Sequence, residues 1–244
     1  MTQRHYAICP ICQAACGLSV ELEGNRVTRV RGHREDPLSR GFVCPKGIAI
    51  GDLHTDPDRV RTPLRREGDR WVEVSWEAAL DESAERIAAL QRRWGRDAAG
   101  LYVGNPTAHN HATLLFLLPF IGVLGSRNYY TSNSLDALPR LLSAQLVFGS
   151  PLLLPIPDID RTEHLLIVGG NPVVSGGSVM TSPGVAQRLK GIRARGGRVV
   201  VVDPRYTETA ALADEHHFIR PGADGLLLAA LVEVLFAEWR VDVG

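Results

Sequence analysis

The strongest constraint in this sequence is the placement of its four cysteines, which all lie within the first 44 of 244 residues. Cys9, Cys12 and Cys16 follow one another closely and Cys44 stands far downstream, in the pattern C-x2-C-x3-C-x27-C. Four thiols gathered near one end of a chain indicate a single four-ligand centre.

Three kinds of centre are possible. Disulfides need an oxidising compartment, and the first residues show no apolar segment typical of a signal peptide. Structural zinc usually uses two C-x2-C pairs, whereas the second half here is a lone cysteine. A [4Fe–4S] cluster suits three thiolates on one tight loop, a distant fourth thiolate and a following proline, here Pro45. We favour the cluster over the other two, and expect Gly17 and Gly47 to let the backbone pass close to sulfur.

The residues around the fourth cysteine carry a family resemblance. The segment from Arg40 to Gly47 has the form R-G-x-x-C-x-K-G. With the first three cysteines it resembles the amino-terminal [4Fe–4S] domain of molybdopterin-dependent oxidoreductases, such as formate dehydrogenases, nitrate reductases and dimethyl sulfoxide reductases. The resemblance implies that Lys46 lies between cluster and pterin and assists electron transfer. Without it, Lys46 would be interpreted as a solvated surface lysine.

Composition excludes several other classes. Basic and acidic residues balance at 27 each, so the net charge is zero and neither nucleic acid nor an anionic membrane is an expected partner. The longest apolar run, Leu114 to Leu124, contains Pro119 and Gly122 and falls short of the roughly 20 residues that a membrane helix needs. No twin-arginine signal precedes Cys9, so the cytoplasm is the expected compartment.

The periodicity of the chain predicts an α/β fold. Residues 18–32 alternate apolar and polar around Gly24-Asn25, which is typical of a β-hairpin. Ser75 is expected to cap a helix over about 77–93. Aliphatic runs at 165–168 and 199–202 flank an expected helix over about 183–195, with Val185, Leu189 and Ile192 on one face. This pattern predicts a βαβ unit whose parallel sheet is buried on both faces.

The expected architecture is a small β-rich [4Fe–4S] domain followed by doubly wound, Rossmann-like parallel-sheet layers that are incomplete at the carboxyl end. We predict a cluster domain over 1–57, the first part of an αβα domain over 58–130, and a Rossmann-like dinucleotide-binding domain over 131–244. Relatives in the family are typically longer, so the chain is expected to be an amino-terminal portion of a larger enzyme or a shortened relative.

Polar residues follow both strands of the predicted βαβ unit. Gly169, Gly170 and Asn171 come after the first strand, and Asp203 and Arg205 after the second. Because carboxyl ends of parallel strands meet at one sheet edge, a dinucleotide-like ligand is expected there. Asp203 can accept hydrogen bonds from a guanine or ribose, the glycines permit close approach, and Arg205 can pair with phosphate. Helix capping and a surface salt bridge are the alternative roles.

The resemblance adds further positions at this edge. In the family, a G-x-N-P turn and a D-P-R-x-T-x-T-A stretch bind one guanine dinucleotide arm of the bis-pterin cofactor, which implies roles for Asn171, Asp203, Arg205 and Thr207. An R-P-G-x-D segment borders the same nucleotide in the family and brings in Asp224. A strand and turn are expected over 218–224, with Asp224 capping the last helix.

The family's metal ligand has no obvious counterpart here. The corresponding stretch, residues 128–136, contains no cysteine. Asp136 is the nearest candidate ligand, since a carboxylate suits an oxidised metal, and Ser134 comes next. Capping of the helix expected to begin near Pro139 is an equally good role for either residue.

The resemblance implies a molybdenum- or tungsten-pterin oxidoreductase with two cofactors, a [4Fe–4S] cluster and bis-molybdopterin guanine dinucleotide. Its expected partners are a small-molecule substrate and an electron-transfer protein or iron–sulfur subunit. One alternative is a non-catalytic electron-transfer subunit resembling the large iron–sulfur subunit of respiratory complex I. Another is a shortened chain that binds the cluster alone.

Overall fold

The computed structural model describes residues 2–177 and 180–241. These residues form two compact units, each built from separated stretches of chain. Unit 1 takes in the described residues of Met1–His5, Val20–Val30 and Lys46–Leu154, and unit 2 those of Tyr6–Ser19, Arg31–Pro45 and Pro155–Gly244. All four cysteines and the expected βαβ unit therefore belong to unit 2. The domain boundaries after residues 57 and 130 stay predictions.

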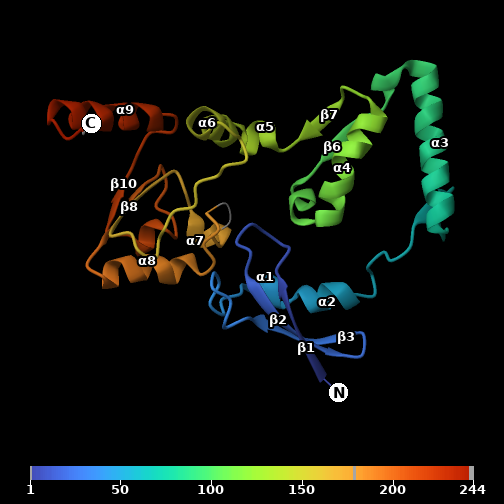
Figure 1. The fold of residues 1–244 in the computed structure, drawn as a ribbon, viewed down its shortest axis with the longest axis horizontal. Helices are drawn as coiled ribbons and strands as arrows, with labels where there is room; N and C mark the ends of the chain where they lie inside the picture. The colour runs from blue at the N-terminus through green and yellow to red at the C-terminus, as the bar shows by residue number, and fades with distance from the viewer. Residues whose placement is uncertain (1, 178–179, 242–244) are drawn as a thin grey trace. The chain divides into compact units, whose positions relative to one another are not determined.

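The secondary structure of the described residues is mixed α and β, as expected (Figure 1). The strands are β1 Thr2–Ile8, β2 Gly17–Glu23, β3 Arg26–Gly32, β4 Leu64–Glu67, β5 Arg70–Glu73, β6 Leu101–Val103, β7 Tyr129–Thr131, β8 His164–Val168, β9 Arg198–Val202 and β10 Glu215–His217. The α-helices are α1 Pro45–Ile48, α2 Ile50–Thr55, α3 Trp76–Trp94, α4 His111–Leu124, α5 Asn133–Asp136, α6 Leu138–Phe148, α7 Pro172–Ser175, α8 Val185–Ala194 and α9 Asp224–Ala237. The 3-10 helices are η1 Arg96–Ala98, η2 Asn105–His109 and η3 Ala210–Leu212.

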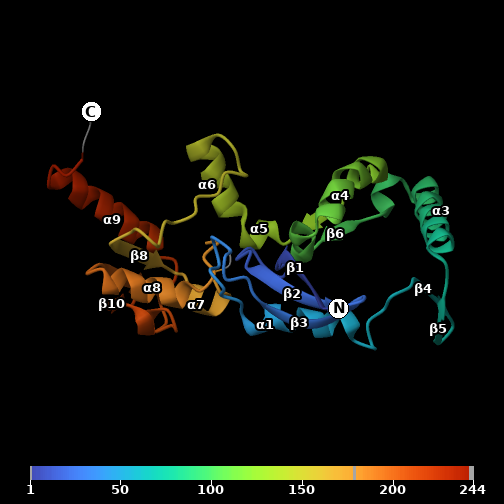
Figure 2. The same cartoon turned by 60° about the horizontal axis from the view of Figure 1, so that its bottom comes forward.

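The amino-terminal region is β-rich. Strands β1, β2 and β3 lie side by side in that order (Figures 1 and 2). Gly24 and Asn25 form the two-residue turn between β2 and β3, and Gly24 adopts the positive φ of 60° that such a turn requires. The predicted hairpin over residues 18–32 is confirmed.

Unit 1 contains an antiparallel hairpin, a long helix and a parallel strand pair. Strands β4 and β5 pair with each other, and Ser75 then caps α3 by accepting a 3.1 Å hydrogen bond from the Ala78 N–H, as predicted. Strands β6 and β7 pair in parallel, with Leu101 opposite Tyr129, and α4 provides the crossover between them. Asn110 caps α4 through the Thr113 N–H.

Unit 2 contains the predicted βαβ arrangement. Strands β8, β9 and β10 form a parallel sheet in the order β10-β9-β8, and α8 connects β8 to β9. The predicted apolar face of α8 is fully buried: Val185, Leu189 and Ile192 are at most 3% exposed. They pack with Val199 and Val201 of β9. Each such buried aliphatic side chain stabilises the fold by about 1.5–3 kcal/mol, so this interface anchors the unit.

Two expectations about this sheet are wrong. The sheet is not buried on both faces, because Leu166 of β8 is 46% exposed on the side opposite the buried Ile167. The last strand lies at Glu215–His217 rather than at 218–224. Its pairing with β9 ends at His217 opposite Val202, because Val202 is the last residue of β9.

No helix within the described ranges is both long enough and apolar enough to cross a membrane.

Candidate functional site

The first three cysteines lie on one tight loop. Strand β1 ends at Ile8 and β2 begins at Gly17, so residues 9–16 connect the two. The Cys9 N–H donates to the Cys16 carbonyl at 2.8 Å and closes the loop at its base. Inside it, the Ala15 N–H donates to the Cys12 carbonyl at 3.3 Å, and Ala15 adopts the uncommon φ of 51°. The loop is thus folded back on itself around its thiols.

The fourth cysteine reaches this loop by a close backbone approach. Cys44 immediately precedes α1, at the end of the segment that follows β3. A Cβ atom at Gly32 would lie 2.0 Å from the Gly41 carbonyl oxygen, so the chain passes itself with no room for a side chain. This crossing returns the segment toward the base of β2.

A carboxylate organises the turn between the two cysteine segments. Asp36 Oδ1 accepts hydrogen bonds from the Ser39 N–H at 2.5 Å, the Ser39 hydroxyl at 2.7 Å and the Leu38 N–H at 3.1 Å. These bonds, led by the Ser39 N–H, lower the pKa of Asp36. Ser39 Oγ in turn accepts from the Gly17 N–H at 3.0 Å, next to Cys16. The two cysteine segments are therefore hydrogen-bonded together.

Gly17 makes room for a carboxylate. A Cβ atom there would lie 2.6 Å from Cγ of Asp36, and the predicted approach of the Gly17 backbone to sulfur stays a prediction. Gly47 is buried in α1, and its predicted approach to sulfur stays a prediction.

The proton of the Cys16 thiol is held more tightly than usual. Burial, and after it the nearby Cys9, Cys12 and Cys44, raises the pKa of the Cys16 thiol to about 11. Cys9 and Cys16 are buried, while Cys12 and Cys44 are partly exposed, and all four are present as thiols. Among the described residues, no three His, Cys, Asp or Glu side chains are spaced to hold a single metal ion.

The two residues predicted to act beside the metal both lie in unit 1. Lys46 is exposed in α1, two residues after Cys44. Asp136 is exposed at the end of α5. The capping alternative for Asp136 and Ser134 is wrong, since Ala137 is the N-cap of α6 and no side chain caps that helix. The electron-transfer role of Lys46 and the ligand role of Asp136 stay predictions.

The second predicted site, the carboxyl edge of the sheet in unit 2, brings its two loops together as expected. After β8, Gly169 adopts φ 63° and donates its N–H to the Val202 carbonyl at 2.8 Å. A Cβ atom at Gly169 would meet nothing within 4 Å, whereas one at Gly170 would lie 3.2 Å from Ile167. Gly169 therefore leaves open space at the end of β8, and its backbone is accessible there.

Asn171 links the two loops through its side-chain amide. Its Oδ1 accepts from the Thr209 hydroxyl at 2.7 Å and the Thr209 N–H at 3.2 Å. Its Nδ2 donates to Glu208 Oε2 at 2.8 Å, and this bond is the main reason why the pKa of Glu208 is lowered. Sequence analysis did not assign Glu208 or Thr209 a role, although both lie inside the D-P-R-x-T-x-T-A stretch.

The residues after β9 are partly occupied with local contacts. Asp203 is buried, and its Oδ1 accepts from the Arg205 N–H at 2.8 Å. Arg205 lies 3.4 Å from Glu208 in an exposed ion pair, and Thr207 Oγ1 accepts from the Ala210 N–H at 3.0 Å. The ion pair is the salt-bridge role that was the alternative to ligand binding. This sheet edge still presents the Asp203 carboxylate, the Asn171 amide and the Arg205 guanidinium.

The expected capping role of Asp224 is wrong. The N-cap of α9 is Ala223, and Asp224 is the first helical residue. It makes no side-chain hydrogen bond or ion pair with any described residue. A carboxylate in this first turn still interacts favourably with the helix dipole.

Most of the sequence matches two known family models. The sequence model described as molybdopterin oxidoreductase matches residues 59–242, and the one described as molybdopterin oxidoreductase Fe4S4 domain matches residues 2–54. The chain belongs to the molybdopterin oxidoreductase family. The cofactors of these two regions are a molybdopterin cofactor for residues 59–242 and a [4Fe–4S] cluster for residues 2–54.

Relatives in the molybdopterin oxidoreductase family include enzymes with different names and substrates. The chain is 27% identical to the probable oxidoreductase YyaE of Bacillus subtilis, covering 99% of this chain and 35% of that protein. It is 29% identical to a nitrate reductase of Symbiobacterium thermophilum (96% and 31% covered) and 27% identical to formate dehydrogenase H of Escherichia coli (96% and 33% covered). The chain thus spans about a third of the length of these relatives.

A solved structure shares the fold. Acetylene hydratase from Pelobacter acetylenicus superposes with a TM-score of 0.79 at 23% identity, over 97% of this chain and 32% of that one.

The residues of unit 2 fit both groups chemically. The four cysteine thiols, with Cys9, Cys12 and Cys44 near Cys16, match the ligand set of a [4Fe–4S] cluster. The open backbone at Gly169, together with Asn171, Asp203 and Arg205, suits a nucleotide at the carboxyl edge of a parallel sheet.

Proposed function

We propose that this chain carries the cluster-binding and part of the pterin-binding machinery of an oxidoreductase. In this function, electrons pass between a molybdenum or tungsten bis-pterin guanine dinucleotide centre and a [4Fe–4S] cluster held by Cys9, Cys12, Cys16 and Cys44. The single observation that carries the proposal is the joint presence, in one compact unit, of the four cysteine thiols and a polar sheet edge centred on Asn171 and Asp203.

The protein supplies binding, orientation and electrostatics, while the bound groups supply the redox chemistry. At the cysteine site, the chain must release thiol protons before its sulfurs can act as ligands. The raised pKa of Cys16 makes this release unfavourable until the cluster binds. The hydrogen bonds of Asp36 and Ser39 hold the two cysteine segments together before the cluster binds. The chain itself therefore positions the thiols.

At the sheet edge, the proposed contacts are divided by chemistry. The Asp203 carboxylate accepts hydrogen bonds from a guanine or ribose, and the exposed Arg205 guanidinium pairs with phosphate. Gly169 and Gly170 allow the pyrophosphate to approach the backbone. Asn171, Thr207 and Asp224 are proposed to border the nucleotide.

Lys46 is proposed to assist electron transfer between cluster and pterin, because it follows Cys44 by only two residues. Asp136 is proposed as a protein ligand to the metal. The proposed partners are a small-molecule substrate and an electron-transfer protein or iron–sulfur subunit. The cytoplasm is the proposed compartment, because thiols reserved for a cluster must stay reduced.

A second candidate is a non-catalytic electron-transfer subunit resembling the large subunit of respiratory complex I. The observation that favours it is the absence of cysteine from residues 128–136, the stretch expected to correspond to the one in which many family members have a cysteine, selenocysteine, serine or aspartate ligand. A chain that binds the cluster alone is a variant of the same idea.

Metal analysis of anaerobically purified protein separates these functions. Iron together with molybdenum or tungsten supports the oxidoreductase, and iron alone supports the electron-transfer subunit. Cys12→Ser is the matched variant: it is expected to abolish the EPR signal of the reduced protein. Colourless parent protein that contains zinc and no iron would overturn both functions.

A further inference from the structure

Arg188, on the first turn of α8, is tied down by three hydrogen bonds although it lies outside both sites. Its Nη1 donates to Asp160 Oδ2 at 2.6 Å and its Nε to the Pro183 carbonyl at 3.0 Å. Its Nη2 donates to the Leu38 carbonyl, which lies 150 positions away in the sequence. The side chain is only 14% exposed. Because the Arg188 guanidinium is largely buried and makes three hydrogen bonds, it fixes the positions of the groups that accept them.

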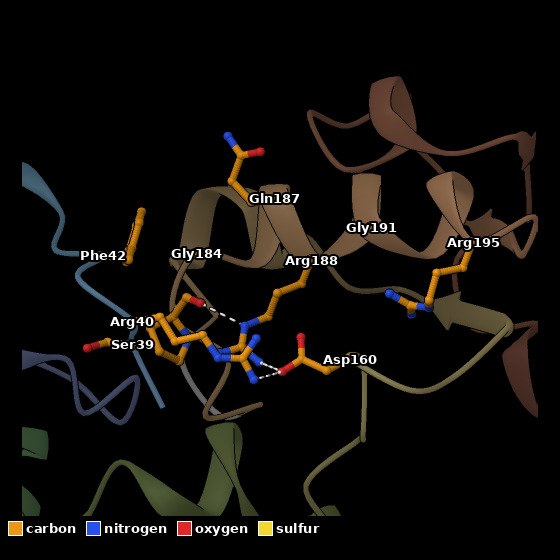
Figure 3. A pocket seen from close by; sticks show the side chains of 10 residues that line it. Ser39, Arg40, Phe42, Asp160, Gly184, Gln187, Arg188, Gly191 and Arg195 are labelled. Atoms are coloured by element: carbon orange, nitrogen blue, oxygen red, sulfur yellow. Dashed lines mark hydrogen bonds and ion pairs between the residues drawn. The ribbon is translucent and has the colours of Figure 1, made fainter. Parts of the chain in front are cut away.

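Asp160 extends this contact to a second arginine. The Oδ2 atom that accepts from Arg188 also accepts from Arg40 Nη2 at 3.0 Å. Figure 3 shows both guanidinium groups converging on Asp160, with Arg40 coming from the cysteine-bearing segment and Arg188 from α8. One carboxylate thus connects the segment before Cys44 to the helix.

The segment held in this way is the turn that organises the cysteines. Leu38 and Arg40, the two residues that contact α8 and Asp160, flank Ser39, whose hydroxyl is hydrogen-bonded to Gly17 beside Cys16. Phe42 donates its N–H to the Ser39 carbonyl at 2.8 Å, and a Cβ atom at Gly184 would lie 3.3 Å from the Phe42 ring. Cys44 follows two residues later.

Packing alone does not hold this turn. Ser39, Arg40 and Phe42 line one part of a cavity of about 400 Å³, and Gly184, Arg188 and Arg195 of the α8 region line another part. Phe42 and Gly184 approach each other closely at one point, and the hydrogen bonds of Arg188 and Asp160 join the two sides of the cavity elsewhere (Figure 3).

We propose that Arg188 is a positioning residue for the iron–sulfur site: it holds the turn over residues 36–42 and thereby fixes where Cys44 lies relative to the three cysteines of the first loop. The proposal rests on the cluster that the proposed function assigns to these cysteines. Arg188 acts through Leu38 and Asp160 and does not itself contact the cluster.

The test compares variants of the full 244-residue chain. Arg188→Gln removes the guanidinium fork, Arg188→Lys keeps the charge without the fork, and Arg40→Gln removes one exposed donor to Asp160. Arg195→Gln is the matched control. Arg195 follows α8 and lines the same cavity, but it donates to the Ile159 and Thr162 carbonyls and not to residues 36–44.

Two measurements report on positioning independently of enzyme activity. In metal-free protein, alkylation of Cys16 and Cys44 is followed by mass spectrometry. In protein reconstituted with iron and sulfide, release of iron to a chelator and the EPR spectrum of the reduced cluster are followed. Loss of charge-assisted hydrogen bonds in Arg188→Gln is expected to accelerate alkylation and iron release about tenfold. Arg188→Lys is expected to resemble Arg188→Gln, because an ammonium cannot serve three divergent acceptors.

Arg40→Gln provides the answer if Arg188→Gln does not fold, because Arg40 is 65% exposed and Asp160 is its only side-chain partner among the described residues. A rise of about threefold in alkylation is expected there. Arg195→Gln should stay within about twofold of the parent. Parent-like alkylation in the Arg188 and Arg40 variants, or an equal effect of Arg195→Gln, would overturn the proposal. A parent that takes up no iron would instead count against the proposed function, and the alkylation comparison would still decide the role of Arg188.

Discussion

The Asn171 side-chain carbonyl accepts two hydrogen bonds from Thr209, one from its hydroxyl at 2.7 Å and one from its N–H at 3.2 Å. Thr209 is fully buried, and its hydroxyl also accepts from the Val173 N–H at 3.2 Å. These contacts join the loop after β8 to the loop after β9. The shape of the proposed nucleotide edge therefore depends on a threonine that does not need to contact the nucleotide.

Thr209→Val is expected to destabilise the protein by about 1–3 kcal/mol, because the partly buried Asn171 amide oxygen loses one of its two donors and the Val173 N–H loses its acceptor. The free energy of unfolding from urea denaturation measures this loss. Thr209→Ser keeps the hydroxyl and is the matched control, with only the loss of a methyl group. Equal stability of the valine variant and the parent would show that the link is dispensable.

Asp203→Ala is expected to weaken binding of GDP, used as a probe for the guanine dinucleotide, by about tenfold or more through loss of a charged acceptor. Isothermal titration calorimetry measures the change. Asp158→Ala removes an exposed carboxylate whose ion-pair partner is Arg161, and it should bind GDP like the parent. Parent-like GDP binding in Asp203→Ala would remove Asp203 from the nucleotide site.

The Cys16 thiol gives the metal-free protein a defined dependence on alkaline pH. Its pKa is about 11 in the folded protein, against an ordinary value of 9.0, so the folded state holds this proton more tightly than the unfolded state. Stability from this group is fully present below pH 9.0 and is lost as the pH rises toward about 11. The difference in unfolding free energy between parent and Cys16→Ala should shrink across this window.

Urea denaturation of both proteins at several alkaline pH values provides the measurement, because the other titrating groups are common to the two. A difference that is constant or grows with pH would contradict the raised pKa. The same proton makes cluster assembly depend on pH, since the sulfur must be deprotonated to become a ligand. Iron uptake should therefore become more favourable as the pH increases.

Gly32→Ala is expected to destabilise the protein by about 1–3 kcal/mol and to lower iron uptake, because the new methyl group would overlap the Gly41 carbonyl and push the segment before Cys44 outward. Gly100→Ala is the matched control: its Cβ atom would meet its nearest neighbour at an ordinary 3.6 Å. Thermal unfolding and iron content measure the two effects. Parent-like iron content in Gly32→Ala would show that this crossing does not position Cys44.

Local pattern was sufficient for much of the fold. The spacing of Val185, Leu189 and Ile192 predicted the buried face of α8, and Ser75 predicted the start of α3. The all-aliphatic strand β9 lies where it was predicted. Burial of the sheet on both faces was overestimated, because Leu166 of β8 is exposed. Helix faces and caps follow from short-range geometry, whereas coverage of a sheet face depends on distant parts of the chain.

Sequence alone determined the four-cysteine pattern, the parallel βαβ unit and the gathering of Asn171 and Asp203 at one edge, because each follows from residue type, periodicity or the shared direction of parallel strands. Only the tertiary structure decided that Asp224 does not cap its helix, that Thr209 joins the two loops, and that Arg188 holds Leu38 across 150 positions. Contacts of this kind join residues that are far apart in the sequence. No periodic pattern links the two partners, so only the folded structure identifies them.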